Sequence, residues 1–318
     1  MRLDSNYYDT DHPEQHQGAH GLCVEEFGNP KGVPLLCLPE NLGLPRSPLT
    51  PRLVDPKYFR ILVVTDQMSC LAHQRNPEGV WFEHLERLRR QLGIDKWVLM
   101  GFSWGANLAL QYAQAYQEQV LAMLMGSVFL AREADIDWWW QGPAHMFPDL
   151  HQTLCEQLGS EDPTSMRERA YNDIHGNDKA KCLPSARALI NYLRELQHES
   201  PVSESNGTWS NDAIIRGAKL LTHYDHHNYF LKENVILRRI DNIRHIPARI
   251  LQGRFDPLTP PRQSFDLHRA WPEANYQLIP ASAHSWHNPH YGHAVRWALD
   301  QLKRAIGPRL TVATSPGR

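Results

Sequence analysis

The sequence predicts an α/β protein whose doubly wound, mostly parallel sheet is interrupted by a mostly helical insertion. Short, continuously apolar segments recur along the chain, and amphipathic segments of helical period lie between several of them. Strands that are apolar throughout are typical of parallel sheets covered on both faces. A long central stretch without this alternation predicts the insertion.

The segments expected to form strands are short, apolar or β-branched, and bounded by turn or polar residues. They are residues 34–38, 60–65, 97–102, 120–125, 248–252 and 276–279. Helices are expected at 82–92, 107–116 and 292–306, where apolar residues recur on one side. This alternation of strands and helices favours an open, doubly wound sheet.

The central stretch divides the chain into three expected parts. Residues 1–134 form the first part of the core, 135–242 a mostly helical cap, and 243–318 the second part of the core. The cap is rich in Trp, His, Asn and Gln and includes a polar loop at 198–211. An insertion of this kind can cover a site at the carboxyl ends of the strands.

Composition excludes several classes of function. The 318 residues include 33 basic and 35 acidic side chains, for a net charge of −2, so no nucleic-acid or membrane partner is expected. The longest apolar run, 120–131, is too short to cross a bilayer. Five cysteines without a CxxC pair, and an N-terminus without an apolar signal region, indicate a cytoplasmic protein. The oligomeric state stays open.

A nucleophile motif follows the expected strand at 97–102. Residues 101–105 read GFSWG, and a helical pattern follows directly. A tight strand-to-helix turn lifts the Ser103 hydroxyl out of the sheet, and glycines on both sides avoid collisions with the backbone. The Trp104 N–H can then donate to an oxyanion at the helix N-terminus. The alternative is an ordinary tight turn with a surface serine.

A serine nucleophile needs a base and a carboxylate that orients it. In folds with this motif, the acid and then the histidine follow the serine along the chain. Asp256 lies in a loop after the strand at 248–252, and His284 lies in a loop after the strand at 276–279. Alternatively, Asp256 caps the turn before Pro257, and His284 is one member of a histidine-rich stretch.

That stretch has histidines at a spacing of three, which raises the question of a metal site. They are His284, His287, His290 and His293. Pro289 would disrupt a helix carrying all of them, and no acidic residue lies within the run. We therefore expect no metal and no other cofactor.

These residues carry a resemblance to the bacterial proline iminopeptidases (prolyl aminopeptidases) of the α/β-hydrolase superfamily. The segments that carry it are GIDKWVLMGFSWGANLALQYAQ (93–114), VFLAREADIDWWWQGPAHMFPD (128–149), GRFDPLTP (253–260), FDLHRAWPEA (265–274) and SAHS (282–285). Together with EEFGNPKGVPLLCL near the start, they span nearly the whole chain. The resemblance implies an α/β-hydrolase core with a helical cap, and release of N-terminal proline from peptides. By position, it makes Ser103 the nucleophile, Asp256 the orienting acid and His284 the base.

The chain departs from that family in two core loops. Where the family has His-Gly-Gly-Pro-Gly after its first core strand, residues 39–43 read PENLG. Pro39 has no N–H, so Glu40 or Asn41 must supply the second oxyanion donor. The family's Asp-Gln-Arg-Gly loop is DQMS here, at 66–69.

The cap also differs where the family holds the amino group of its substrate. The family uses a glutamate just before His-Tyr-Phe, and residues 226–230 read HHNYF here. His226 takes the place of the glutamate and Asp225 lies beside it, so both are candidates for substrate binding, with Tyr229. Equally, they form a polar cap surface. Trp139 and its neighbours Trp138 and Trp140 either line a pocket for a proline-like ring or pack the cap onto the core.

The function predicted first is a serine hydrolase that releases N-terminal proline through an acyl-enzyme. The first alternative keeps the triad and acts on another small ester, amide or lactone. The second is a non-catalytic relative that binds a ligand. The expected partner is a small peptide or another small molecule.

Overall fold

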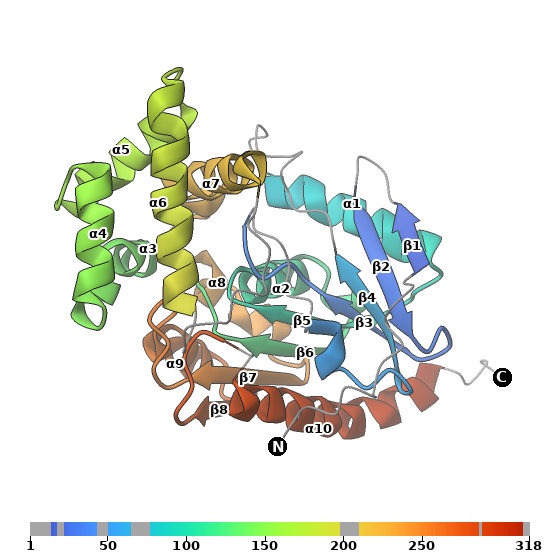
Figure 1. Ribbon diagram of the computed structural model, residues 1–318. Helices are drawn as coiled ribbons and strands as arrows, with labels where there is room; N and C mark the ends of the chain where they lie inside the picture. Colours follow the sequence, from blue (N-terminus) through green and yellow to red (C-terminus); the bar gives the residue numbers. More distant parts are fainter. Residues whose placement is uncertain are drawn as a thin grey trace.

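The computed structural model describes residues 14–17, 22–42, 50–64, 77–197, 210–285 and 288–313. Its centre is an eight-stranded sheet in the order β1-β2-β4-β3-β5-β6-β7-β8 (Figure 1). The strands are β1 Glu14–Gln17, β2 Cys23–Gly28, β3 Val33–Cys37, β4 Phe59–Val64, β5 Trp97–Phe102, β6 Val120–Gly126, β7 Ala248–Gly253 and β8 Asn275–Ile279. From β4 to β8 all neighbouring strands are parallel, whereas β1 and β2 are antiparallel. The predicted α/β class and mostly parallel sheet are confirmed.

The sequence pattern predicted the parallel strands but not β1 and β2. The inner parallel strands β4 to β7 are apolar and buried over most of their length, and in β5 and β6 every residue is buried, whereas the edge strand β8 is mostly only partly buried. In β2, buried and partly exposed residues alternate, as in an antiparallel strand with one solvated face. A search for continuous apolar runs therefore does not detect β2.

Ten helices are described, with short 3₁₀ turns between some of them. The helices are α1 Pro77–Gln91, α2 Trp104–Ala115, α3 Glu133–Gln141, α4 Pro148–Leu158, α5 Pro163–His175, α6 Lys179–Gln197, α7 Asn211–His226, α8 Val235–Arg238, α9 Pro261–Ala270 and α10 Pro289–Ala313. The 3₁₀ turns are Thr50–Leu53, Gln117–Gln119, Gly142–His145, Asn228–Phe230 and Ile240–Ile243.

The helices expected from the sequence at 82–92, 107–116 and 292–306 correspond to α1, α2 and α10. Pro289 begins α10, so this helix does not extend back to His284, in line with the expectation that Pro289 would disrupt a helix carrying all four histidines. Proline is well tolerated there because the first turn of a helix has no intrahelical acceptor for its N–H groups.

Helices cover both faces of the sheet. Neighbouring residues of a strand point to opposite faces, so Leu99 joins the core that includes α1 and α2, whereas Val98 joins the core that includes α10. Figure 1 shows α10 running along one face of the sheet, with α1 and α2 across the other. Burial on both faces accounts for the continuous apolar strands.

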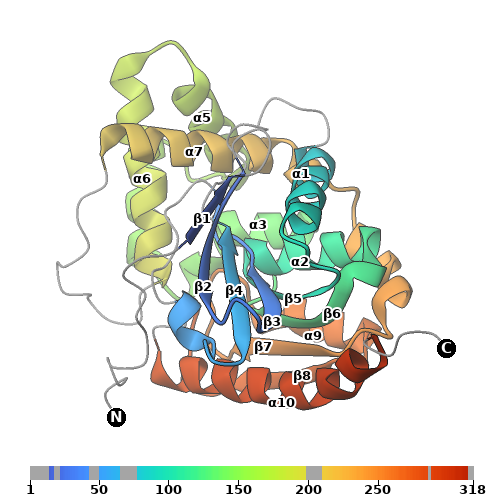
Figure 2. The same cartoon turned by 90° about the vertical axis from the view of Figure 1, so that its right-hand side faces the viewer.

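Helices α3 to α8 lie in the chain between β6 and β7. Among them, α5, α6 and α7 pack against one another, and α4 packs against α6. Together these helices form a layer beside the sheet, which is the cap (Figures 1 and 2). Buried residues of this layer are continuous with the core around α2. In the described part of the chain, we find no helix whose length and hydrophobicity would let it span a membrane.

Candidate active site

The turn between β5 and α2 has the geometry of a nucleophile elbow. Ser103 lies in it with a φ of 52° and a ψ of −117°, a backbone conformation that residues other than glycine rarely adopt. A Cβ atom on Gly101 would lie 2.1 Å from the Gly105 carbonyl oxygen, and one on Gly105 would lie 2.9 Å from that of Pro39. These contacts give the physical reason for both glycines of the motif.

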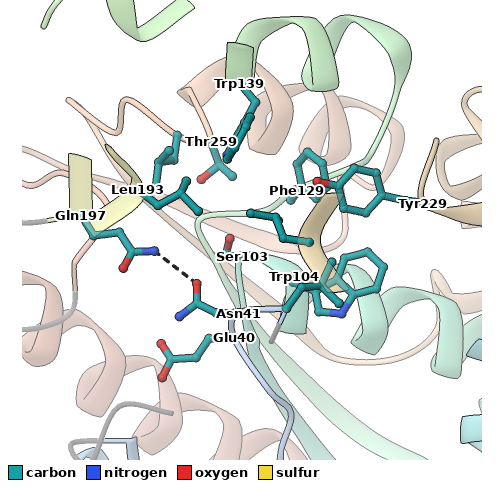
Figure 3. A pocket seen from close by; sticks show the side chains of 13 residues that line it. Glu40, Asn41, Ser103, Trp104, Phe129, Trp139, Leu193, Gln197, Tyr229 and Thr259 are labelled. Atoms are coloured by element: carbon teal, nitrogen blue, oxygen red, sulfur yellow. Dashed lines mark hydrogen bonds between the residues drawn. The ribbon is translucent and has the colours of Figure 1, made fainter. Parts of the chain in front are cut away.

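The elbow uses the backbone groups of Ser103 and leaves its side chain facing a cavity. The Ser103 N–H donates to the Gly126 carbonyl at 3.0 Å, and its own carbonyl accepts from the Ala106 N–H at 3.1 Å. The side chain lines a pocket under the cap (Figure 3). A hydroxyl held by strained backbone at a helix N-terminus is well placed to attack a bound carbonyl.

Asp256 and His284 meet at the carboxyl ends of β7 and β8. His284 Nδ1 lies 2.9 Å from Oδ2 and 3.0 Å from Oδ1 of Asp256. The carboxylate also accepts from the N–H groups of Leu258 and Thr259 and from the amide of Gln252. An N–H at Nδ1 that donates to Asp256 leaves Nε2 as the nitrogen that can accept a proton.

The two loops that carry this pair are joined to each other. The Phe255 N–H donates to the Ser282 carbonyl at 2.9 Å, and Arg254 N–H donates to the Ile279 carbonyl at 3.0 Å. A Cβ atom on Gly253 would lie 2.3 Å from the Ala283 carbonyl oxygen, so the loops approach closely there. This contact fixes the loop after β8 against the end of β7.

Thr259 connects the pair to the pocket that contains Ser103. Its hydroxyl lies 2.9 Å from Asp256 Oδ2 and 3.1 Å from His284 Nδ1, and Thr259 lines the pocket. The structure thus brings the three residues of the predicted triad to one edge of the sheet, where β5, β7 and β8 all end. Thr259 was not predicted, although its place three residues after Asp256 is typical of a turn capped by an aspartate.

The pocket is small and mostly apolar. Its volume is about 60 Å³, which suits a short or compact acyl group. Its walls are aromatic and aliphatic, with polar groups from the loop after β3, from Ser103 and from Thr259. The lining residues are Glu40, Asn41, Leu42, Ser103, Trp104, Phe129, Trp139, Leu193, Gln197, Leu221, Tyr229, Leu258 and Thr259.

The expected oxyanion donors lie at this pocket, but one of them is already engaged. The Trp104 N–H donates to the carbonyl oxygen of Glu40 at 3.2 Å. Sequence reasoning placed an N–H of Glu40 or Asn41 beside Trp104, and the structure places a carbonyl there instead. The difference arises because the backbone direction in a loop is set by its packing. Residue 43 of this loop, and the loop at 66–69, lie outside the described residues.

The cap residues expected to bind substrate separate into two groups. Tyr229 and Trp139 line the pocket, as expected of residues that contact a substrate. Trp138 and Trp140 do not: Trp138 Nε1 donates to the Pro257 carbonyl at 2.8 Å, and Trp140 is buried in the cap. The sequence could not separate the three tryptophans, because it does not show which side of α3 faces Ser103.

Asp225 and His226, which were expected to bind substrate, are not among the residues that line the pocket. Asp225 is buried, accepts from Trp140 Nε1, and forms an ion pair with Arg167 at 2.7 Å. Burial raises the pKa of Asp225 to about 6, against the opposing effect of Arg167. His226 is exposed and stacks on the Tyr171 ring with centroids 4.0 Å apart.

In the described part of the chain, the side chains that could together bind a metal ion lie away from the pocket. Glu14, His16 and Glu26 form the one group of three whose ligand atoms lie within 4.8 Å of one another. Both oxygens of Glu26 accept hydrogen bonds from Arg60 at 2.8 Å.

The histidines of the spaced run do not form such a group in the described structure. His290 and His293 are exposed on α10, and His287 lies outside the described residues.

Comparison with known proteins agrees with this geometry. A sequence model of the alpha/beta hydrolase fold matches residues 82–290. A proline iminopeptidase from Neisseria gonorrhoeae is 30% identical over 300 residues, which cover 92% of this chain and 94% of that protein. A proline iminopeptidase from Xanthomonas citri is 30% identical over 292 residues, covering 88% and 92%.

Solved structures of low sequence identity share the fold. An alpha/beta fold family hydrolase from Bacillus anthracis str. Sterne superposes with a TM-score of 0.59 at 16% identity, covering 93% of this chain and 99% of that one. A putative aryl esterase from Burkholderia cenocepacia gives a TM-score of 0.59 at 15% identity, covering 95% and 100%.

The fold and the elbow therefore define an α/β hydrolase, and the chain is a hydrolytic enzyme. The relatives that match most of its sequence identify a narrower family within this class. The chain belongs to the proline iminopeptidase family, as its sequence motifs predicted.

Proposed function

We propose that the chain is a prolyl aminopeptidase that releases N-terminal proline from peptides through a serine triad. The observation that carries this proposal is the Asp256–His284 pair, hydrogen-bonded at 2.9 Å and joined through Thr259 to the pocket of Ser103. Family membership supports the substrate class, because the curated relatives bear the name proline iminopeptidase.

The reaction runs in two steps. Ser103 Oγ attacks the carbonyl carbon of the N-terminal residue, and His284 Nε2 takes the hydroxyl proton. His284 then gives this proton to the leaving amine as the C–N bond breaks, which leaves an ester on Ser103. Water then attacks the ester with His284 again as base, the bond between the acyl carbon and Ser103 Oγ breaks, and His284 returns the proton to Oγ as the free amino acid leaves. Asp256 holds the imidazole in the tautomer that this sequence requires.

The pocket supports a compact acyl group such as a prolyl ring. Phe129, Trp139 and Tyr229 supply aromatic faces near Ser103, and Leu193 supplies an aliphatic one (Figure 3). Leu42, Leu221 and Leu258 also line the pocket. A ring of this kind gains free energy by leaving water and needs few polar contacts beyond those at its carbonyl.

The direct test compares prolyl-β-naphthylamide with leucyl-β-naphthylamide. We expect a kcat/KM at least tenfold higher for the prolyl compound, and no turnover by Ser103→Ala. Ser264→Ala is the matched control, because Ser264 is buried in α9 and its Oγ donates to the Pro261 carbonyl. Equal rates with the two substrates would contradict the specificity, and turnover by a folded Ser103→Ala protein would contradict the mechanism.

A second function is favoured by one observation, the ion pair that holds Asp225 away from the pocket. With Asp225 and His226 absent from the lining, Glu40 is the one acidic residue among the described residues that line the pocket, and most of the other lining residues are apolar, which favours an uncharged acyl group. The enzyme would then hydrolyse a small ester, amide or lactone. Turnover of an aryl acetate together with no turnover of the prolyl compound would select this function.

The proposed location of the enzyme is the cytoplasm. An odd number of cysteines without a CxxC pair supports a reducing compartment. Fractionation of the native cell tests this proposal, and recovery of the protein outside the cytoplasmic fraction would contradict it.

A further inference from the structure

The oxyanion site next to Ser103 is filled by the protein's own backbone. The Trp104 N–H, which begins α2, donates to the Glu40 carbonyl at 3.2 Å. A tetrahedral intermediate on Ser103 needs that N–H for its negative oxygen. A carbonyl oxygen in the same place repels the oxyanion, so this arrangement is a resting state and has to change before the reaction.

The change required is a rotation of one peptide unit. In a trans peptide the C=O and the following N–H point in opposite directions. Turning the unit between Glu40 and Asn41 by about half a turn therefore takes the carbonyl out of the oxyanion site and brings the Asn41 N–H toward it. Trp104 and Asn41 then supply the two donors that the reaction uses.

The preceding part of the loop is fixed, which confines the rotation to this peptide. The Leu38 N–H donates to the Met100 carbonyl of β5 at 2.9 Å. The carbonyls of Leu38 and Pro39 lie so close to Gly105 that a Cβ atom there would be 3.1 and 2.9 Å from them. The ring of Pro39 restricts its φ angle as well.

The cap contacts Asn41, the residue that follows this peptide, through its side chain. Gln197, the last residue of α6, donates from Nε2 to Asn41 Oδ1 at 3.2 Å. Figure 3 shows this hydrogen bond at the pocket, beside Ser103 and Trp104. The bond is present in the same conformation in which the Glu40 carbonyl accepts from the Trp104 N–H.

We propose that Gln197 is a positioning residue, which acts through Asn41 to keep the oxyanion site filled until the cap helix α6 moves. The inference rests on the proposed serine chemistry. Leu193 lies one turn before Gln197 on α6 and lines the same pocket. A bound acyl group that displaces Leu193 therefore moves the residue that holds Asn41, and the peptide is released when substrate is present.

The test measures the rate at which a fluorophosphonate labels Ser103, since its P=O oxygen needs the same two donors. Gln197→Leu removes the hydrogen bond and keeps the apolar stem. A typical net hydrogen bond corresponds to about a 2- to 10-fold shift in an equilibrium. We expect labelling to be faster by about that factor, and kcat for an aryl acetate to rise with little change in KM. A role in stability alone would slow labelling rather than speed it.

Two further variants make the test independent of any one substitution. Asn41→Ala removes the acceptor and keeps the backbone N–H, so it should accelerate labelling by a similar factor, and the double variant should add nothing. Gln152→Leu is the matched control, an exposed glutamine on α4 that should label at the parent rate.

The outcomes separate the inference from the proposed function. A labelled parent whose Gln197→Leu and Asn41→Ala forms label at the same or a lower rate overturns the inference alone. Additive effects in the double variant also overturn it. Absence of Ser103 labelling in every folded variant overturns the proposed function, and the inference with it.

Discussion

His284 presents its Nδ1 to both carboxylate oxygens of Asp256, at 2.9 and 3.0 Å, and the Asp256 side chain has no exposed surface. A carboxylate in this position fixes the imidazole tautomer and stabilises the imidazolium that forms during the reaction. Several donors around Asp256 compensate for its burial.

Asp256→Asn tests this relationship. The amide can donate a hydrogen bond to Nδ1, which favours the wrong tautomer, so we expect kcat to fall by about 10⁴-fold. Steady-state kinetics with the best substrate measures the change, and circular dichroism checks the fold. Asp241→Asn is the control, because that side chain is 80% exposed and should change kcat by less than about twofold. A loss of less than tenfold for Asp256→Asn would contradict the assigned role.

Gly101→Ala should destroy the nucleophile elbow. The new methyl group would lie 2.1 Å from the Gly105 carbonyl oxygen, and neither backbone segment can move without displacing Ser103. We expect a destabilisation of about 3 kcal/mol or more and loss of fluorophosphonate labelling.

Gly307→Ala is the matched control for the elbow. Gly307 lies within α10, and a Cβ there meets nothing within 4 Å. The same substitution should raise the unfolding free energy by about 0.5–1 kcal/mol, because alanine favours a helix. A stable, fully active Gly101→Ala protein would show that the elbow is not as tight as described.

Asp225 and His226 should differ in what their substitution changes. Asp225→Asn removes the partner of Arg167 inside the cap and should lower the unfolding free energy by about 1–3 kcal/mol. His226→Gln changes an exposed ring and should leave the unfolding free energy within about 0.5 kcal/mol of the parent. At a temperature where each variant is folded, KM for the prolyl substrate should change by less than twofold. A tenfold rise in KM for either variant would return that residue to the substrate site.

His175 should make the cap less stable in acid. It lies half-buried on α5, where its Nε2 contacts the Thr222 hydroxyl at 3.1 Å. Burial, with nearby His223, lowers the pKa of His175 from 6.5 to about 4. The unfolded chain therefore binds a proton at His175 more readily than the folded protein does. The contribution of this histidine to stability is present above pH 6.5 and is lost as the pH falls toward 4.

The measurement is the unfolding free energy in urea at pH 7 and pH 4. His175→Gln keeps a polar side chain without titrating, so its loss between the two values should be smaller than the parent's by about 1–2 kcal/mol, after allowance for solvent screening. Asp225, whose pKa is raised to about 6, acts in the opposite direction but is present in both proteins. His290→Gln, on the exposed surface of α10, should follow the parent. Identical losses in the parent and His175→Gln would contradict the prediction.

Local patterns predicted much of the core because their causes are local. The apolar strands, the glycines of the elbow and the positions of Asp256 and His284 after two strands all follow from short-range sequence. Strand β2 was not predicted because one of its faces is solvated.

The sequence by itself determined the order of the elements, the elbow at Ser103 and the acid and histidine that accompany it. Only the tertiary structure decided which cap residues reach the pocket and which way the Glu40 peptide points. Asp225 and His226 are neighbours on α7, yet one is buried against Arg167 and the other lies on the surface, since successive side chains of a helix point in different directions. Which direction faces the pocket depends on how α7 packs, and that packing depends on residues far away along the chain.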